Sequence, residues 1–277
     1  MSLHIQVARP SSAYAPYVKY YKYIESDLSG VFKVVPIPYI EMYFNFTSCE
    51  VISPGHYELT RPMVHIAGLH SSGQEGYSRM NGTGRGGGFC IVFKPQGFDQ
   101  LFGIKSAELC QYAVDGLSVF GEPAERLYHR LEQSHDIDEM VFWTEWFFKA
   151  LRKPPRHNAD RIHHIIGYME GIHGMSSTSE VCRRFSMTQR TLQRTFKNEI
   201  GLSPKELMQI FRINHALKMI RKYPEKNLTT ISYLSGYYDQ SHFIRDIRRI
   251  TGMAPGKLVS GTGNNFTISN REFIRSH

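Results

Sequence analysis

The sequence has few cysteines and no long apolar segment. Its 277 residues include four cysteines, none of which belongs to a Cys-x-x-Cys pair: Cys49, Cys90, Cys110 and Cys182. We therefore expect reduced, structural thiols, as in a cytoplasmic protein. No run of about 18 apolar residues is present, so we expect no transmembrane helix and no membrane partner. The first residues lack the basic and apolar regions of a secretory signal, and we expect none.

Motifs for catalysis and metal binding are also scarce. Residues 82–88, Gly-Thr-Gly-Arg-Gly-Gly-Gly, lack the GxxxxGK[ST] order of a phosphate-binding loop and precede a predicted strand, so we interpret them as a connection between strands. His56, His65 and His70 lack the spacing of a metal-binding cupin, which favours structural histidines. No Ser/His/Asp or Cys/His set can be assembled. We therefore expect no enzyme, no metal site and no cofactor.

The positive charge is concentrated in the second half. Residues 1–155 carry 14 Lys and Arg against 16 Asp and Glu, a net charge of −2, whereas residues 156–277 carry 19 against 9, a net charge of +10. Together they give the overall +8. A strongly basic half favours a polyanionic partner, because its cations can neutralise phosphates and release counterions. Charge alone leaves a merely soluble basic surface as an equal alternative.

The pattern of side chains predicts an α+β protein with two main domains. Residues 154–160 contain two consecutive prolines between polar flanks, which is typical of a linker. We expect an N-terminal effector-binding or oligomerisation domain at 1–153, an all-helical domain at 161–260 and a flexible tail at 261–277. Short β-type segments are predicted at 17–24, 32–35, 40–46, 63–67 and 89–93. Helical spacing follows from 97 to 152.

One helical segment of the first half is rich in aromatic residues. Residues 137–151 have apolar side chains three and four positions apart, as in a helix with a buried face. We interpret Trp143, Trp146, Phe147 and Phe148 as its buried side rather than as an aromatic cage.

An internal repeat with a period of about fifty residues lies in the basic half. Residues 178–201 and 229–252 align when Leu192 is matched with Phe243 and Phe196 with Ile247. Each segment predicts a short helix, a tight polar turn and a second helix with a buried stripe. The pattern is that of two helix-turn-helix units joined by a linker helix at 204–222.

Details of each unit support this interpretation. In the first unit we expect Val181 and Cys182 to face inward, and Ser186 or Thr188 to cap the second helix. In the second unit Ile231 and Leu234 have the inward role, and Asp239 or Ser241 can cap the next helix. Gly236 suits a turn position that needs a positive φ.

The outward faces of the two second helices are rich in Gln and Arg. Arg can pair with guanine and Gln with adenine in the major groove, and basic residues at a helix end can contact phosphates. One such face fits an ordinary solvated helix, but two faces in register favour DNA binding. The candidate DNA-binding residues are Gln189, Arg190, Gln193, Arg194 and Lys197 of the first unit and Gln240, Ser241, His242, Arg245 and Arg248 of the second.

Residues 160–258 resemble the DNA-binding domain of the AraC/XylS family of transcriptional regulators. Residues 190–205 resemble the family's first recognition helix and the turn after it, and residues 236–243 with 248–255 resemble its second signature. Ser232 and Ile247 stand where the family usually has Ala and Phe, and both changes concern packing. The resemblance implies base contacts by Arg190, Gln193, Arg194, Gln240, Ser241, His242 and Arg245.

The resemblance also implies a geometry and partners. Two recognition helices on a rigid linker helix are expected to enter successive major grooves of double-stranded promoter DNA, about 34 Å apart. Residues 28–46 and 89–109 are similar to a β-rich N-terminal domain of some AraC-like regulators, which implies a sensing or oligomerisation role. We expect RNA polymerase, a small-molecule effector and a second copy of the chain as further partners. We expect an activator, although the sequence itself does not distinguish activation from repression.

Two other functions were weighed against a sequence-specific regulator. An enzyme fused to a DNA module, such as an alkyl-DNA repair regulator, requires a cysteine-rich metal cluster or a Pro-Cys-His nucleophile motif, and the sequence contains neither. A non-specific architectural protein requires charge without base readers, which the two Gln- and Arg-rich faces argue against.

Overall fold

A computed structural model describes residues 3–26, 30–34, 36–46, 50–52, 64–69, 76–80, 86–110, 113–153, 159–251 and 254–255. Predictions about Cys49, His56, His70, most of the glycine-rich segment, most of the linker and the tail lie outside these residues.

None of the helices in the described ranges is long and apolar enough to cross a membrane. The three described cysteines, Cys90, Cys110 and Cys182, form no disulfide among the described residues.

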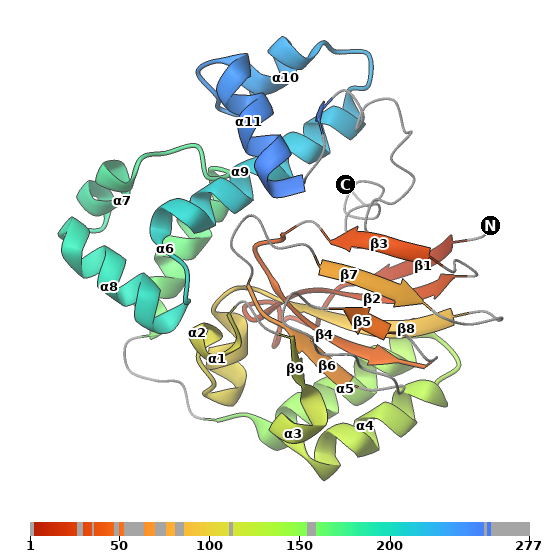
Figure 1. Ribbon diagram of the computed structural model, residues 1–277. Coiled ribbons are helices and arrows are strands. Elements are labelled where there is room, and N and C mark those ends of the chain that lie inside the picture. The colour runs from red at the N-terminus through yellow and green to blue at the C-terminus, as the bar shows by residue number, and fades with distance from the viewer. Residues whose placement is uncertain are drawn as a thin grey trace.

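The N-terminal part contains two antiparallel sheets (Figure 1). The larger sheet has the order β1 (Leu3–Ala8), β2 (Val18–Ser26), β8 (Gly86–Phe93), β4 (Ile40–Asn45), β6 (Val64–Ala67) and β9 (Ala113–Asp115). The smaller sheet has the order β3 (Gly30–Val34), β7 (Gly76–Met80) and β5 (Glu50–Ile52). The five predicted strands correspond to β2, β3, β4, β6 and β8, whereas β1, β5, β7 and β9 were not predicted.

Helices cover one face of the larger sheet. They are α1 (Gly97–Phe102), α2 (Ser106–Leu109), α3 (Gly116–Phe120), α4 (Glu122–Glu132) and α5 (Ile137–Leu151). Tyr21, Ile91, Met42 and Ile66 are paired across four neighbouring strands and are fully buried in the core on this side. The α+β prediction is confirmed.

The neighbouring row of side chains in the same sheet is polar. Lys22 pairs with Cys90, Cys90 with Tyr43 and Tyr43 with His65, so alternation puts all four on the opposite face. Lys22 is fully buried, and its Nζ lies 2.6 Å from Oε1 of Glu41. The hydroxyl of Tyr43 donates to Oε2 of Glu41 at 2.5 Å. The N-terminal part (the β domain) therefore contains a buried ion pair. Such pairs stabilise a fold less than well-packed apolar side chains do.

His65 is integrated into this polar row. Its ring stacks on Tyr43 with centroids 4.7 Å apart, and its Nδ1 lies 3.0 Å from Nδ2 of Asn45. Burial lowers the pKa of His65 to about 4, so the ring is neutral at pH 7. The described residues contain no group of three potential ligands placed to hold a metal ion.

The aromatic prediction for α5 is only partly correct. Phe147 and Phe148 are buried and Trp143 is half-buried, but Trp146 is 58% exposed. The reason is helical geometry: Trp146 lies two positions from Thr144 and Phe148, which both face the core, and therefore points away from it.

The C-terminal part is all-helical, and Figure 1 shows it beside and above the sheets. It consists of α6 (Ala159–Gly171), α7 (Thr178–Arg184), α8 (Gln189–Glu199), α9 (Pro204–Lys222), α10 (Leu228–Leu234) and α11 (Gln240–Thr251). One hydrophobic core extends from the sheets through α6, α7, α8 and the first half of α9. A second core joins the other half of α9 to α10 and α11.

Polar contacts join the two parts of the chain. Glu170 of α6 accepts hydrogen bonds from Nζ of Lys19 at 2.6 Å and from the hydroxyl of Tyr39 at 2.7 Å. Nζ of Lys105, which precedes α2, lies 2.9 Å from Oε1 of Glu199 at the end of α8. The β domain therefore contacts both the first helix of the C-terminal part and the end of α8.

Two stacked histidines connect the turn after α6 to α9. The rings of His173 and His215 lie 4.1 Å apart and nearly parallel. Burial, followed by the charge of His173, lowers the pKa of His215 to about 4, and burial with the charge of Lys218 lowers that of His173. Glu170 and Lys19 act on His173 in opposite directions. Both rings are therefore neutral in the folded protein at pH 7.

This pair predicts a loss of stability in acid. An unfolded histidine takes up its proton near pH 6.5, whereas folded His215 resists it down to about pH 4, so the contribution is complete above pH 6.5 and declines as the pH falls towards 4. We expect His215→Gln to reduce the difference in free energy of unfolding between pH 7 and pH 5, measured by urea titration. His129→Gln, at an exposed histidine of α4, is the control. An equal pH dependence in both variants would contradict the prediction.

Candidate nucleic-acid interface

The first repeat unit has a complete set of helix caps and a buried stripe. Ser177 accepts a hydrogen bond from the amide of Glu180 at the start of α7, and Thr188 accepts one from Thr191 at the start of α8. Leu192 and Phe196 are fully buried, as predicted. Of the two proposed caps, Thr188 is the one that caps α8.

The turn of the first unit uses a strained residue. Ser186 has φ 48°, a left-handed conformation that L-residues with a Cβ adopt at a cost. In the second unit Gly236, fifty positions later, has φ 74°. The predicted positive φ at Gly236 is confirmed. The repeat therefore extends to the backbone conformation of the turn.

The outward face of α8 is open to solvent. Gln189, Arg190, Gln193, Arg194 and Lys197 are all exposed, on the side opposite the buried stripe. Within the part of the chain that the structure describes, neither Arg190 nor Arg194 forms an ion pair. Their guanidinium groups are thus available to an external anion or acceptor.

The second unit repeats the caps and the stripe of the first. Asn227 accepts from the amide of Thr230 at the start of α10, and Asp239 accepts from the amide of His242 at 2.7 Å, so Asp239 is the cap of α11. Phe243 and Ile247 are fully buried, as is Ile231. Leu234 is 45% exposed, so its predicted inward position is wrong. It is the last residue of the short helix α10, where the chain turns away from the core.

The outward face of α11 is more constrained than that of α8. Ser241, His242, Arg245 and Arg248 are exposed. Gln240 is only half-buried and its side-chain oxygen accepts a hydrogen bond from Oγ1 of Thr229 at 2.8 Å. The side-chain oxygen of Gln240 is therefore held by Thr229 of α10, and its NH₂ group can donate a hydrogen bond to an external partner.

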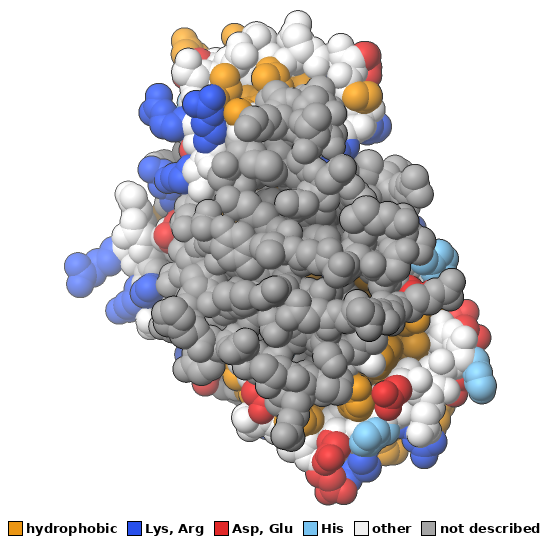
Figure 2. Space-filling view, turned by 45° about the vertical axis from the view of Figure 1, so that its right-hand side comes forward, with side chains coloured by type: hydrophobic (Ala, Val, Ile, Leu, Met, Phe, Trp, Pro, Cys, Tyr) orange, Lys and Arg blue, Asp and Glu red, His pale blue; other side chains and the backbone are white. Residues whose placement is uncertain are grey.

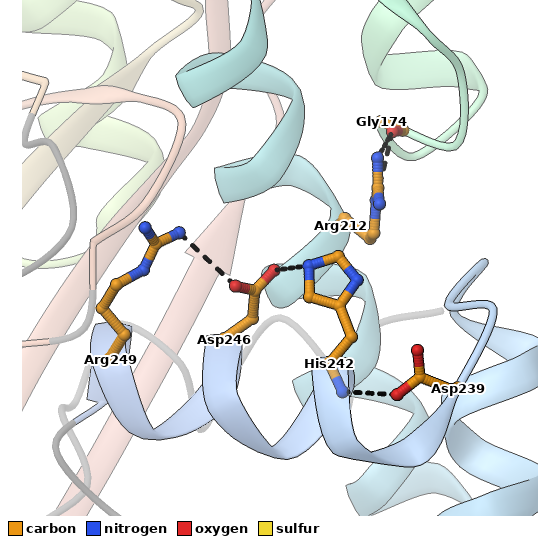
Figure 3. Close-up of polar contacts among 6 residues, drawn as sticks. All are labelled: Gly174, Arg212, Asp239, His242, Asp246 and Arg249. Carbon is orange, nitrogen blue, oxygen red and sulfur yellow. Dashed lines mark hydrogen bonds and ion pairs between the residues drawn. The ribbon is translucent and has the colours of Figure 1, made fainter.

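The buried carboxylate of Asp246 on α11 contacts the side chains of His242 and Arg249 (Figure 3). Asp246 is 6% exposed; its oxygens lie 3.5 Å from Nε2 of His242 and 3.4 Å from a terminal nitrogen of Arg249. Burial and the charge of Asp246 raise the pKa of the nearby Tyr237 hydroxyl. Asp246 was not among the predicted residues, although an acid four residues after His242 and three before Arg249 has the spacing of helical ion pairs.

Helix α9 joins the two helix-turn-helix units and is held in place at its start and in its middle. Ser203 and Glu206 form a capping box at its start, with bonds of 3.2 and 2.8 Å. In its middle, Arg212 donates to the carbonyl oxygen of Gly174 and lies over the ring of Tyr237, 5.5 Å from the centroid. Arg212 therefore contacts the turn before α7 and the turn before α11 together.

The surface charge agrees with the distribution along the sequence. Figure 2 shows Lys and Arg side chains projecting from one side of the upper and middle molecule, while Asp and Glu are more frequent at the lower end. The second helices of the two repeat units, α8 and α11, contribute the exposed cations Arg190, Arg194, Lys197, Arg245, Arg248 and Arg249. Two capped helices with exposed Gln, Ser, His, Arg and Lys side chains can bind phosphates and hydrogen-bonding base edges.

Comparison with known families matches both halves of the chain. A Helix-turn-helix domain family matches residues 181–260, and a Domain of unknown function (DUF6597) matches residues 6–115. The first match contains α8, α9, α10 and α11. The second contains the end of β1 and the whole of the other eight strands of the described residues.

Curated relatives match the C-terminal part. The HTH-type transcriptional activator RhaS of Escherichia fergusonii is 28% identical over 102 residues, which is 36% of this chain and 36% of the relative. RhaS of Escherichia coli strain SE11 is 27% identical over 114 residues, 40% of each chain. The chain thus matches little more than a third of the length of these relatives.

Solved structures share the whole fold. A 1.65 Å structure of ToxT from Vibrio cholerae has a TM-score of 0.52 and 11% sequence identity, and the likeness covers 94% of this chain and 98% of that one. Wild-type ToxT from the same species with an unsaturated fatty acid bound has a TM-score of 0.50 and 13% identity, over 94% and 95%. The helix-turn-helix match, the RhaS relatives and the ToxT-like fold together support the assignment of the chain to the AraC/XylS family of transcriptional regulators.

Proposed function

We propose that the protein is a sequence-specific transcription regulator that binds promoter DNA with α8 and α11. The proposal rests on one structural feature that occurs twice. In each unit the second helix is capped, has a buried stripe and has an outward face of Gln, Ser, His, Arg and Lys side chains. A single basic helix explains non-specific binding, whereas two matched faces with base-reading side chains fit an extended, specific site.

The proposed roles follow from position on each helix. Arg190, Gln193 and Arg194 of α8 read bases, together with Gln240, Ser241, His242 and Arg245 of α11. Gln189 contacts DNA at the start of α8. Lys197 and Arg248, near the ends of their helices, contact phosphates. Helix α9 has 19 residues and a length of about 28 Å at 1.5 Å per residue, a span suited to two recognition helices one DNA turn apart.

The remaining proposals concern regulation. The N-terminal domain, with a boundary near 154–160, senses a small molecule or mediates dimerisation. A fatty acid is bound by ToxT, and this domain contains a buried polar row whose ion pair adds little to stability. Because RhaS proteins are activators, we propose that this chain activates transcription with RNA polymerase, on chromosomal DNA in the cytoplasm.

Contacts between the parts provide a route for such regulation. Lys105 holds Glu199 at the end of α8, and Gly201, with φ 87°, lies so close to α2 that a Cβ would be 2.6 Å from Cβ of Cys110. A movement of α2 would therefore displace the end of a recognition helix. We propose that an effector acts on DNA binding through this contact.

Two substitutions on α8 distinguish a contact with a base from a contact with a phosphate. We expect Arg194→Ala to weaken binding to the specific site by about 1–3 kcal/mol with little effect on random DNA. Lys197→Ala should weaken binding to all sequences and reduce the dependence of affinity on salt. Fluorescence anisotropy over a salt series measures both. Equal losses on specific and random DNA for Arg194→Ala would show that it is a phosphate contact.

Selection of bound sites from a random DNA pool tests the function as a whole. We expect an asymmetric site with two half-sites about one helical turn apart, each protected in footprinting. The affinity for the selected site should exceed that for random DNA by about a thousandfold or more at fixed salt. A ratio near one would contradict the proposal.

A ligand screen by thermal shift on the full chain tests the sensing role. A compound that binds only the folded state raises the melting temperature, and the stabilisation increases with the logarithm of the ligand concentration above the dissociation constant. We expect such a ligand also to change DNA affinity, and Lys105→Ala to weaken that coupling. A ligand that stabilises the protein without any effect on DNA binding would contradict the proposed route through Glu199.

A further inference from the structure

The imidazole of His242 lies between a buried acid and solvent. Its Nε2 lies 3.5 Å from Oδ2 of Asp246, which is one helical turn further along α11 and 6% exposed, whereas the side chain of His242 is 47% exposed. Figure 3 shows the second ring nitrogen, Nδ1, on the side of the ring away from Asp246. Within the described part of the chain, Nδ1 has no polar partner. One nitrogen of His242 therefore contacts the protein itself, and the other is left for an external partner.

Neighbouring groups restrict the rotation of this ring. The ring of Tyr237 meets it edge-on, with centroids 5.4 Å apart, and Asp239 accepts a hydrogen bond from the backbone amide of His242 at 2.7 Å. Tyr237 is 3% exposed and lies under the guanidinium of Arg212, which donates to the carbonyl oxygen of Gly174. The orientation of the imidazole, with Nε2 towards the acid, is therefore determined before any partner binds.

The pair of histidine and acid is specific to the second repeat unit. His242 and Asp246 of α11 align with Thr191 and Thr195 of α8. The hydroxyl of Thr191 lies 2.8 Å from that of Thr188, the cap of its own helix. The first unit therefore forms its capped helix and buried stripe without a carboxylate at this position. Because a buried carboxylate loses its hydration at a cost in stability, its presence in α11 indicates a role beyond the fold of the unit.

A carboxylate beside Nε2 determines which ring nitrogen carries the hydrogen. A neutral imidazole has one N–H donor and one lone pair, and a lone pair on Nε2 would face the negative charge of Asp246. The 3.5 Å contact is longer than an ideal hydrogen bond, but the electrostatic preference has the same sign at this distance. A carboxylate holds a histidine in one tautomer in the same way in Ser-His-Asp triads. In neutral His242 the hydrogen is therefore on Nε2 and the lone pair is on Nδ1.

We propose that Asp246 is a positioning residue that makes Nδ1 of His242 a hydrogen-bond acceptor on the outward face of α11, and that His242 thereby reads an exocyclic amino group in the major groove. Adenine N6 and cytosine N4 are donors there, whereas guanine and thymine present acceptor oxygens at the equivalent places. The arginines of α8 and α11 are donors only and cannot make this contact. The inference rests on the proposed function and adds the class of base that is read at one position of the DNA site.

Asp246→Asn is a nearly isosteric change that reverses this arrangement. Oδ1 of Asp246 lies 3.4 Å from a terminal nitrogen of Arg249, which is a donor only, so the carbonyl oxygen of the new carboxamide stays on that side. Its NH₂ group then takes the place of Oδ2 and donates to Nε2 of His242. The imidazole hydrogen moves to Nδ1, which becomes a donor. We therefore expect the preferred bases at the contacted position to change from adenine or cytosine to guanine or thymine.

Nitrogen NMR of the full chain without DNA tests the positioning role. The imidazole signals of His242 are assigned by their absence in His242→Ala, and the spectra are recorded at pH 8. We expect hydrogen on Nε2 in the wild type and on Nδ1 in Asp246→Asn. The control is Asp239→Asn, which also removes one negative charge beside His242 but keeps a good helix cap, so the tautomer should not change. The same tautomer in the wild type and in Asp246→Asn would overturn the positioning role.

Selection of bound sites from a random DNA pool, carried out with each variant, tests base reading. At one position of the half-site bound by α11, we expect Asp246→Asn to reverse the preference and His242→Ala to lose it, a change of about tenfold in relative affinity. All other positions, and the whole site selected by Asp239→Asn, should match the wild type. Melting temperatures verify folding, and His242→Ala at an exposed residue tests base reading even if Asp246→Asn does not fold. An unaltered preference in His242→Ala would overturn the inference.

The two experiments separate this inference from the proposed function. If the wild type selects no site, the proposed function fails and base reading by His242 fails with it, whereas the NMR spectra still decide the role of Asp246. If the wild type and Asp246→Asn select the same site, the proposed function stands and the inference is overturned. A changed tautomer together with a changed base at one position supports both.

Discussion

The packing of α9 is the constraint on which the arrangement of α8 and α11 depends. Leu207 and Phe211 in its first half belong to the core shared with the β domain, whereas Ala216 and Leu217 in its second half belong to the separate core of α10 and α11. A helix resists bending because its backbone hydrogen bonds would break, so burial at both ends determines the relative position of two units. The capping box at Ser203 and the bridging contacts of Arg212 strengthen this link.

The outward faces of α8 and α11 differ in how many of their side chains are held by other side chains. On α11, Thr229 holds Gln240, and Asp246 holds His242 and Arg249. These side chains are therefore partly ordered in the free protein and lose less conformational entropy when they bind a partner. On α8, Arg190 and Arg194 are exposed. Because α8 also ends against α2, its position depends on the β domain, whereas α11 packs against α9 and α10 in the second core.

The β domain combines an apolar layer with a polar one, and the two layers have different consequences. The layer around Tyr21 and Ile91 joins the sheet to its helices and, through them, to the first repeat unit. The layer around Lys22 and Glu41 contains a desolvated ion pair, and apolar residues of similar volume often replace such pairs without loss of stability. A polar layer that contributes little to stability is consistent with the ligand-binding role proposed for the β domain.

The sequence by itself determined the features that depend on residues close together in the chain. The turn signals, the caps at Thr188 and Asp239 and the spacing of Leu192 with Phe196 predicted both helix-turn-helix units, because helical periodicity and capping are local. Tertiary structure alone decided what depends on distant partners. It paired the short strands β5, β7 and β9, exposed Trp146 and Leu234, buried Asp246, and placed the end of α8 against α2. Strand pairing and burial arise from contacts between segments far apart in sequence, and no local pattern encodes which segments will meet.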